Sequence, residues 1–293
     1  MTANETAPLV HIGYHKTGTT WLQQVGFSTL AGADVMVDRL TRSLLTELIE
    51  TDDTPAVAML RQRSDHVRAR GRVPIFSLES LSGRVFHGSR EPHRTLERLH
   101  DALPDARILV TVREQASMLV SLYALYVQAG GHVNFERFLA SDAEGLDFDP
   151  DHIAFDDLVS QYNKTFPDVI VLPYEQLRGD PTSFLQLVGD RIDLNVEASP
   201  PATRSNPSLH GWRLQLLRRW NANFRSSRLN PRPPLAVPRA GAMRWVLQRS
   251  VPPPRGPSPH LLRARQFAQR YAESNRRLAS LVDLSGYGYP GVD

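Results

Sequence analysis

The first two thirds of the chain alternate short apolar runs with longer stretches of helical periodicity. The apolar runs have the length of buried strands, which are expected at Leu9–Gly13, Val73–Leu78, Ile108–Val112 and Val169–Pro173. The stretches between and after them predict helices at Thr19–Leu30, Pro55–Arg70, Pro92–Ala102, Ser117–Gln128, Ile153–Phe166 and Pro181–Ile192. Parallel strands need crossover helices, so this order predicts an α/β fold with a doubly wound parallel sheet flanked by helices. Ligands of such sheets bind beyond the carboxyl ends of the strands.

The sequence changes in character after Pro200. Helices are expected at Leu209–Phe224 and His260–Val282, but nine of the 22 prolines fall in Asn230–Pro259. Proline lacks a backbone N–H and interrupts both helices and inner strands. We therefore expect a single domain, 1–293, with a sheet core at 8–200. The C-terminal section, 201–293, is expected to be helical and to act as a lid and acceptor wall, and its segment 230–259 is expected to be either a mobile loop or an ordered lid.

Arginine is concentrated in the same C-terminal section. From Arg204 to Arg277 there are 16 arginines and one acidic residue, Glu273, although the net charge of the whole chain is only +3. Such a field attracts phosphates, sulfates, nucleic acid or an anionic surface. An arginine-favouring genome is the alternative explanation, because only two of the 34 basic residues are lysines.

Several classes of protein are excluded by what the sequence lacks. There is no cysteine, which excludes disulfides, thiolate metal sites and cysteine nucleophiles. No apolar run approaches the roughly 18–20 residues of a membrane span. Residues 1–7 lack the basic and apolar regions of a secretory signal. We expect a soluble, cytoplasmic protein without a bound metal, because the acidic and histidine residues show no convergent metal spacing. Its oligomeric state is not legible.

The residues between the first expected strand and the first helix have the character of an anion-binding turn. They read Gly13-Tyr14-His15-Lys16-Thr17-Gly18-Thr19-Thr20-Trp21. Glycine lets the backbone approach a ligand closely, and the N–H groups at the start of a helix bind anions. Lys16 adds a charge, and the threonines add hydroxyl donors. The turn makes the expected fold P-loop-like, but Lys16 precedes Gly18 by two residues, whereas the nucleotide triphosphatase motif places its lysine directly after the glycine.

This loop resembles the 5′-phosphosulfate-binding loop of sulfotransferases that use 3′-phosphoadenosine 5′-phosphosulfate (PAPS). The family motif reads roughly Lys-x-Gly-Thr-Thr-Trp after a strand, and the chain matches it at Lys16, Gly18, Thr19, Thr20 and Trp21. The resemblance implies that the loop, including Thr17, binds the 5′ end of PAPS. It also implies that Lys16 stabilises the bridging oxygen of the leaving phosphate and that Trp21 stacks on the adenine.

A second motif resembles the 3′-phosphate site of the same family. That site has an arginine at a strand end and a serine after seven intervening residues, as Arg113 and Ser121 stand here. Two helical turns span about 7.2 residues, so Ser121 can return to the side of the helix where Arg113 lies. Ser117, one turn earlier, is a weaker candidate. Taken alone, Arg113 is equally well explained by an ordinary salt bridge.

Weaker likenesses extend over the rest of the chain. Tyr174 begins a Tyr-Glu-Gln-Leu segment that resembles the family's "YEDL" segment, whose tyrosine lies near the adenine. Arg255 and Gly256 match a basic-Gly loop that covers the 3′-phosphate in cytosolic members. The final segment, from Tyr271 to Pro290, resembles bacterial members of the superfamily.

The resemblance implies transfer of a sulfuryl group from PAPS to a hydroxyl or amine of a small-molecule or carbohydrate acceptor, by in-line displacement and without a metal. Such a reaction needs a base for the acceptor's proton. Cytosolic members carry a histidine after the strand equivalent to Val73–Leu78, and here the position holds Glu79. We therefore expect Glu79 to be the base, with His15 as its competitor beside Lys16. His11 is expected to be a core histidine with satisfied hydrogen bonds.

Two other functions remain open from the sequence. A P-loop-type small-molecule kinase would need ATP and Mg²⁺. A nucleic-acid-binding protein would use the arginines between Arg204 and Arg277, together with aromatic residues that stack on bases. We expect no nucleic-acid partner. The identity of the acceptor is not legible, since its pocket is built from loops.

Overall fold

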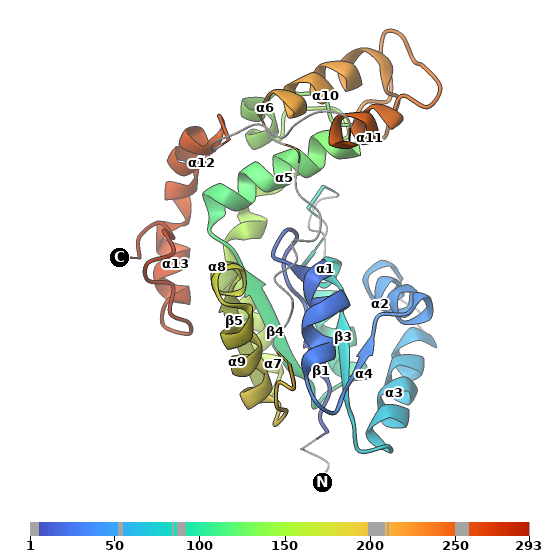
Figure 1. Cartoon of the computed structure of the whole chain (residues 1–293), viewed down its shortest axis with the longest axis vertical. Helices are drawn as coiled ribbons and strands as arrows, with labels where there is room; N and C mark the ends of the chain where they lie inside the picture. Colours follow the sequence, from blue (N-terminus) through green and yellow to red (C-terminus); the bar gives the residue numbers. More distant parts are fainter. Residues whose placement is uncertain are drawn as a thin grey trace.

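The computed structural model describes residues 6–51, 55–83, 85–86, 92–198, 209, 211–249 and 258–292. Among them, five parallel strands form one sheet in the order β2-β3-β1-β4-β5 (Figure 1). The strands are β1 (Leu9–His11), β2 (Ala33–Met36), β3 (Val73–Ser77), β4 (Arg107–Val112) and β5 (Asp168–Pro173). The predicted α/β fold with a doubly wound parallel sheet is therefore confirmed.

Both faces of the sheet are covered, which explains why its strands are continuously apolar. Successive side chains of a strand point to opposite faces. In β1, Leu9 accordingly packs in one apolar cluster with Ile75 and Leu109. The next residue, Val10, packs in the other cluster with Phe76. A strand buried on both faces has no polar side to show, so its sequence does not alternate.

Helices from different parts of the chain cover the two faces. On one face lie α3 (Pro55–Arg68), α4 (Pro92–Ala102) and α7 (Phe155–Thr165), whose buried side chains belong to the larger cluster. On the other face lie the helical run that begins with α1 (Thr19–Trp21) and the helix α9 (Pro181–Arg191). The predicted helices of this region are present; α4 has the predicted bounds, and the others have shifted ends.

Some elements differ from the expectation. The helix expected at Thr19–Leu30 consists of α1, a π-helical segment (Leu22–Gly26) and a 3₁₀ turn (Phe27–Thr29). The sequence analysis missed the edge strand β2 and four helices. The missed helices are α2 (Arg39–Glu50), α6 (Phe135–Leu139), α8 (Tyr174–Gly179) and α11 (Ala242–Arg249). The helix expected at Ser117–Gln128 is α5 (Gln115–Ala129), which begins two residues earlier because Glu114 caps it.

The C-terminal section is helical, as expected, but its helices are shorter. They are α10 (Gly211–Phe224), α11, α12 (Leu261–Ala268) and α13 (Ala272–Leu278), with a 3₁₀ turn between the last two. Part of the segment 230–259, for which a mobile loop is expected, is helical, because α11 lies within it. No proline occurs between Pro238 and Pro252, so this part of the segment is free to form a helix. Residues 250–257 lie outside the described residues.

The C-terminal helices share the core of the sheet. The apolar cluster that contains Val110 of β4 also contains Leu217 of α10, Ala264 of α12 and Leu278 of α13. Figure 1 shows α5 lying between the sheet and α10. Within the described residues, no helix combines the length and the apolar character needed to cross a bilayer.

The order of the strands determines where the candidate site begins. β1 is the central strand, with β3 on one side and β4 on the other. Consecutive crossovers therefore diverge at the carboxyl end of β1, which is the point where doubly wound sheets bind ligands. The Gly13–Gly18 turn follows directly there.

Candidate active site

The turn after β1 is held by backbone bonds to β4 and by two left-handed residues. The amides of Ile12 and Tyr14 donate to carbonyl oxygens of β4 at 3.0 and 3.3 Å. Lys16 has a φ of 70° and Gly18 a φ of 89°. A Cβ on Gly18 would lie 2.7 Å from Cδ2 of Leu177, so this position requires glycine both for its backbone angle and for space.

Thr17 and Thr19 use their hydroxyl groups differently. The Thr17 hydroxyl donates to the carbonyl oxygen of Tyr14 and thereby closes the turn. The Thr19 Oγ1 atom is buried and has no hydrogen-bond partner among the described residues. A buried hydroxyl without a partner is costly unless a ligand satisfies it. Thr19 begins α1, and Thr20 is partly exposed beside it.

Arg113 links this turn to the start of α5. It follows β4, and its Nη1 atom donates to the carbonyl oxygen of Lys16 at 2.8 Å. Its Nε atom donates to Oγ of Ser117 at 3.0 Å, and its guanidinium carbon lies 4.8 Å from the ring centre of Tyr174. The structure thus brings together three of the candidate residues, Lys16, Arg113 and Tyr174.

The two serine candidates lie on α5, and only Ser117 bonds Arg113. Ser121 is buried in the second turn of the helix. The hydrogen bond of Arg113 goes to Ser117, the candidate that the sequence analysis ranked lower. The guanidinium reaches the first turn of the helix because it leaves β4 only four residues before Ser117.

The two aromatic candidates, Tyr174 and Trp21, pack against the same apolar cluster of the sheet. Tyr174 begins α8, and its ring edge would be 3.3 Å from a Cβ on Gly18. Trp21 is partly exposed and packs over Gly26, where a Cβ would lie 2.8 Å from its Cζ3 atom. Arg255 and Gly256 lie outside the described residues.

His15 and Glu79 face each other across the ends of β1 and β3. The Nδ1 atom of His15 lies 3.6 Å from Oε1 of Glu79, and the two side chains are 17% and 42% exposed. The proximity of His15 is the main cause that lowers the pKa of Glu79, although 3.6 Å is too long for a hydrogen bond. Burial opposes this shift, while the charge of Lys16 adds to it. The two candidate bases are therefore a pair.

Lys16 and Arg113 form a partly buried cationic pair. Desolvation is the first cause that lowers the pKa of each, and the Arg113 charge lowers that of Lys16 further. No carboxylate among the described residues lies within ion-pair distance of Arg113. Its hydrogen bonds go instead to the neutral oxygens of Lys16 and Ser117.

His11 is a core residue, as expected. Its Nδ1 atom lies 2.8 Å from Oγ of Ser77, and its Nε2 atom lies 2.7 Å from Oγ1 of Thr111. Burial lowers its pKa to about 4, so it is neutral at pH 7. The ring fills the space above Gly13, where a Cβ would be 2.3 Å from Nε2.

Two neighbours of the site were missed in the sequence. His152 lies against the ring of Tyr14, with ring centres 5.1 Å apart, and burial lowers its pKa to about 4. Glu175 accepts from the amide of Glu114 at 3.1 Å and from the hydroxyl of Tyr289 at 3.1 Å. These three contacts join residues that lie more than 50 positions apart in the sequence, so no local pattern could have shown them.

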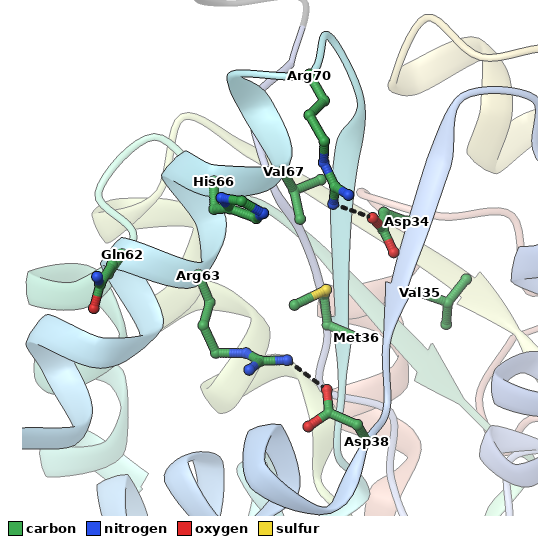
Figure 2. Close-up of a pocket in the computed structure, with 9 residues that line it drawn as sticks. All are labelled: Asp34, Val35, Met36, Asp38, Gln62, Arg63, His66, Val67 and Arg70. Atoms are coloured by element: carbon green, nitrogen blue, oxygen red, sulfur yellow. Dashed lines mark hydrogen bonds and ion pairs between the residues drawn. The ribbon is translucent and has the colours of Figure 1, made fainter.

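A depression of about 580 Å³ between β2 and α3 lies apart from this site. Figure 2 shows that ion pairs between Arg63 and Asp38 and between Arg70 and Asp34 cross it. It opens at β2, which is the edge strand. None of the candidate site residues described above lines it. The described residues contain no group of three or more acidic or histidine side chains placed to hold a metal.

The comparisons with known proteins point to one family. A family model of the sulfotransferase domain matches residues 8–197. A sulfotransferase structure from Alicyclobacillus acidocaldarius superimposes with a TM-score of 0.57 at 17% identity, covering 96% of this chain and 98% of that one. At this identity the likeness shows a shared fold. No curated protein sequence matches the chain.

Two further sulfotransferase structures resemble the chain more distantly. Mouse sulfotransferase SULT7A1 complexed with PAP has a TM-score of 0.45 at 13% identity, covering 94% of this chain and 89% of that one. The sulfotransferase domain from the curacin biosynthetic pathway has a TM-score of 0.40 at 11% identity, covering 89% and 96%.

Proposed function

The chain belongs to the sulfotransferase family, and we propose that it moves the sulfuryl group of PAPS to a hydroxyl or amine of a small-molecule or carbohydrate acceptor. The observation that carries the choice of donor is the contact between Arg113 and Lys16. This bond turns the buried Arg113 guanidinium toward the Lys16 turn, and its described hydrogen bonds go only to neutral oxygens, so a bound anion would offset the desolvation that lowers the pKa of both cations. A donor with phosphate at both ends of its ribose supplies such anions.

The residues present fit this donor. The turn formed by Lys16, Thr17, Gly18, Thr19 and Thr20 would hold the 5′ end. Thr17 would act through its backbone, since its hydroxyl is bonded to Tyr14, whereas the unpartnered Thr19 hydroxyl is available to a ligand.

The same proposal assigns the other end of the donor. Arg113 would hold the 3′-phosphate, assisted by Ser117 and by Ser121 one turn later. Tyr174 and Trp21 would lie against the adenine. Arg255 and Gly256 keep the role that the resemblance implies for them, as a basic loop over the 3′-phosphate.

PAPS supplies an activated sulfuryl group, with 3′-phosphoadenosine 5′-phosphate (PAP) as the leaving group. Lys16 would offset the negative charge that develops on the leaving phosphate oxygen. The protein's remaining task is to orient the acceptor in line and to remove its proton.

We assign the proton transfer to the pair His15 and Glu79. A carboxylate whose pKa is lowered stays ionised at pH 7 and is a weak proton acceptor. An imidazole that donates from Nδ1 to a carboxylate has its Nε2 atom available to take a proton. His15 is therefore the proposed base and Glu79 its orienting partner, which reverses the order expected from the sequence.

The C-terminal section is part of the same functional unit in this proposal. We propose one domain, 1–293, with the sheet core at 8–200 and the helical section at 201–293. The apolar cluster that contains Val110, Leu217 and Leu278 supports a single domain, because the sheet core and the C-terminal helices both contribute to it.

The proposed function is tested by product formation. The full chain is incubated with PAPS and a panel of phenols, sugars, alcohols and amines, and sulfated products are detected by mass spectrometry. A parallel titration measures binding of PAP and of ATP with and without Mg²⁺. Sulfated product with PAP binding supports the proposal. Binding of ATP and Mg²⁺ in preference to PAP, without a sulfated product, would contradict it and favour the kinase.

A further inference from the structure

The helix α10 packs on the rest of the fold with only one of its faces. Leu214, Leu217 and Asn221 are buried on that face. The Asn221 side chain donates from Nδ2 to the carbonyl oxygens of Val127 at 2.7 Å and of Gly131 at 2.9 Å, at the end of α5. The opposite face of α10 is turned outward, on the far side of α5 from the sheet (Figure 1).

The outward face carries large apolar side chains. Trp212 is 50% exposed, and Leu216, one turn later, is also exposed. Arg219 follows at the next helical position, so the three form one stripe. The stripe continues beyond the helix, because the amide of Leu235 donates to the carbonyl oxygen of Asn223 at 2.9 Å. Leu235 is 64% exposed.

The neighbouring helix α12 extends this surface. The Nε2 atom of His260 lies 3.3 Å from Nε2 of Gln215, which brings the start of α12 beside α10. Leu262, in the first turn of α12, is 72% exposed. We call Trp212, Leu216, Leu235 and Leu262 the apolar face. A cluster of exposed large apolar side chains marks an interaction surface.

The segments that carry the apolar face are cationic in sequence, although exposed carboxylates of the neighbouring segment, such as Glu136, lie at its border. The sequence contains no aspartate or glutamate from 198 to 272. Arg219 and Arg232 are exposed on the same elements as the apolar face. At its border, Arg263 pairs with Glu136 of α6 at 2.9 Å. A partner must therefore be anionic and must also offer an apolar phase.

We propose that the apolar face docks on a lipid bilayer that contains anionic lipid. Arginine side chains lay their apolar stems along the interface and reach the anionic headgroups, while leucine and tryptophan enter the boundary of the acyl chains. Nucleic acid matches the charge and can stack on Trp212, but it offers no apolar phase to Leu216, Leu235 and Leu262. This docking is independent of the proposed sulfuryl transfer.

The test is flotation of the full chain with two kinds of vesicle. One kind is phosphatidylcholine alone, and the other contains about one third phosphatidylglycerol. The face variant carries Leu216→Ser, Leu235→Ser and Leu262→Ser. The matched control carries Leu40→Ser, Leu187→Ser and Leu281→Ser, which are exposed leucines outside the apolar face. Circular dichroism and thermal melting check that each variant is folded.

The parent and the control are expected to bind the anionic vesicles and to bind phosphatidylcholine far more weakly. The face variant should bind anionic vesicles about tenfold more weakly or worse. Arg219→Gln with Arg232→Gln should weaken binding by about fivefold per arginine. A parent that does not bind, or a face variant that binds like the control, overturns the proposal. So does a parent that ignores vesicles but binds a short DNA duplex.

A second measurement uses Trp245→Phe, which removes the other largely exposed tryptophan and leaves Trp212 on the apolar face. Vesicles with brominated acyl chains quench tryptophans that enter the bilayer boundary. Quenching of this variant on anionic brominated vesicles supports the proposal. Binding without quenching shows a purely electrostatic contact and overturns it.

Discussion

The Nη1 atom of Arg113 donates a 2.8 Å hydrogen bond to the backbone carbonyl of Lys16. The same guanidinium bonds Ser117 in the first turn of α5, so one cation fixes the turn after β1 relative to the helix after β4. Lys16 has a left-handed backbone, which the bond to its carbonyl helps to hold. The charge and the shape of the proposed donor site therefore depend on one side chain.

Replacing Arg113 should weaken binding of PAP more than binding of adenosine monophosphate. PAP carries the 3′-phosphate that Arg113 is proposed to hold, and a hydrogen bond to a charged group is worth about 1.5–3 kcal/mol, or roughly tenfold to a hundredfold in affinity. Arg113→Gln is expected to lose this preference. Calorimetric titration of both nucleotides measures it, and Ser117→Ala is the milder comparison. Equal losses for the two nucleotides would show that Arg113 supports the turn without contacting the 3′-phosphate.

Gly18→Ala should destabilise the chain more than Gly71→Ala. Both glycines have left-handed φ values, 89° and 69°, so both substitutions cost about 1–2 kcal/mol of backbone strain. Only at Gly18 does the added Cβ meet a side chain, Leu177, at 2.7 Å, whereas nothing lies within 4 Å at Gly71. Thermal melting should show the larger drop for Gly18→Ala, by about 2–4 °C per additional kcal/mol.

A double variant tests whether the clash with Leu177 causes the loss of stability at Gly18. Gly18→Ala should cost less stability in a Leu177→Ala background, because the methyl group then has room. An identical cost in both backgrounds would locate the damage in the backbone strain alone. A Gly18→Ala protein as stable as Gly71→Ala would contradict the packing described here.

Acid should destabilise the fold partly through His11. Burial lowers its folded pKa to about 4, below the value of 6.5 for an exposed histidine. The unfolded chain therefore binds the proton more readily, and its contribution to stability is full above pH 6.5 and falls as the pH drops toward 4. The difference between these two pKa values corresponds to about 3 kcal/mol.

Urea unfolding at several pH values between 7 and 4 measures this slope. His11→Asn loses the bonds to Ser77 and Thr111 and is less stable throughout, but its unfolding free energy should fall less steeply over this range. The exposed His66→Gln is the comparison and should keep the parent slope. An unchanged slope for His11→Asn would assign the acid sensitivity to other groups.

Local sequence pattern predicted the elements whose signal is contained within one segment. The apolar strands, the turn from Gly13 to Gly18 and the arginine after β4 were all legible, because each depends on neighbours in sequence. The edge strand β2 was missed, since Asp34 interrupts its four residues. The helix α2 was missed although Asp38 caps it and leucines recur at helical spacing, so that signal was present in the sequence.

The pairing inside the site could not be read in the same way. His15 and Glu79 meet because β3 lies next to β1, and strand order is set by packing of the whole sheet. Arg113 reaches Ser117 and not the next turn because of where its side chain leaves β4. The resemblance supplied the residue types, while the fold decided which of them touch.

The proposed base is tested by two substitutions that keep shape and remove proton transfer. His15→Gln should lower turnover with PAPS by about 10²–10⁴-fold, the usual cost of losing a general base. Glu79→Gln should lower it less, because His15 keeps its Nε2 atom and loses only the carboxylate that orients it. PAP binding should be nearly unchanged in both, since neither side chain contacts Lys16 or Arg113 in the described hydrogen bonds.

The relative sizes of the two losses in turnover separate the two roles. If Glu79→Gln instead abolishes turnover while His15→Gln retains it, the carboxylate is the base and the assignment is reversed. Normal turnover in both variants would show that the acceptor reacts without a protein base, as an acidic phenol does.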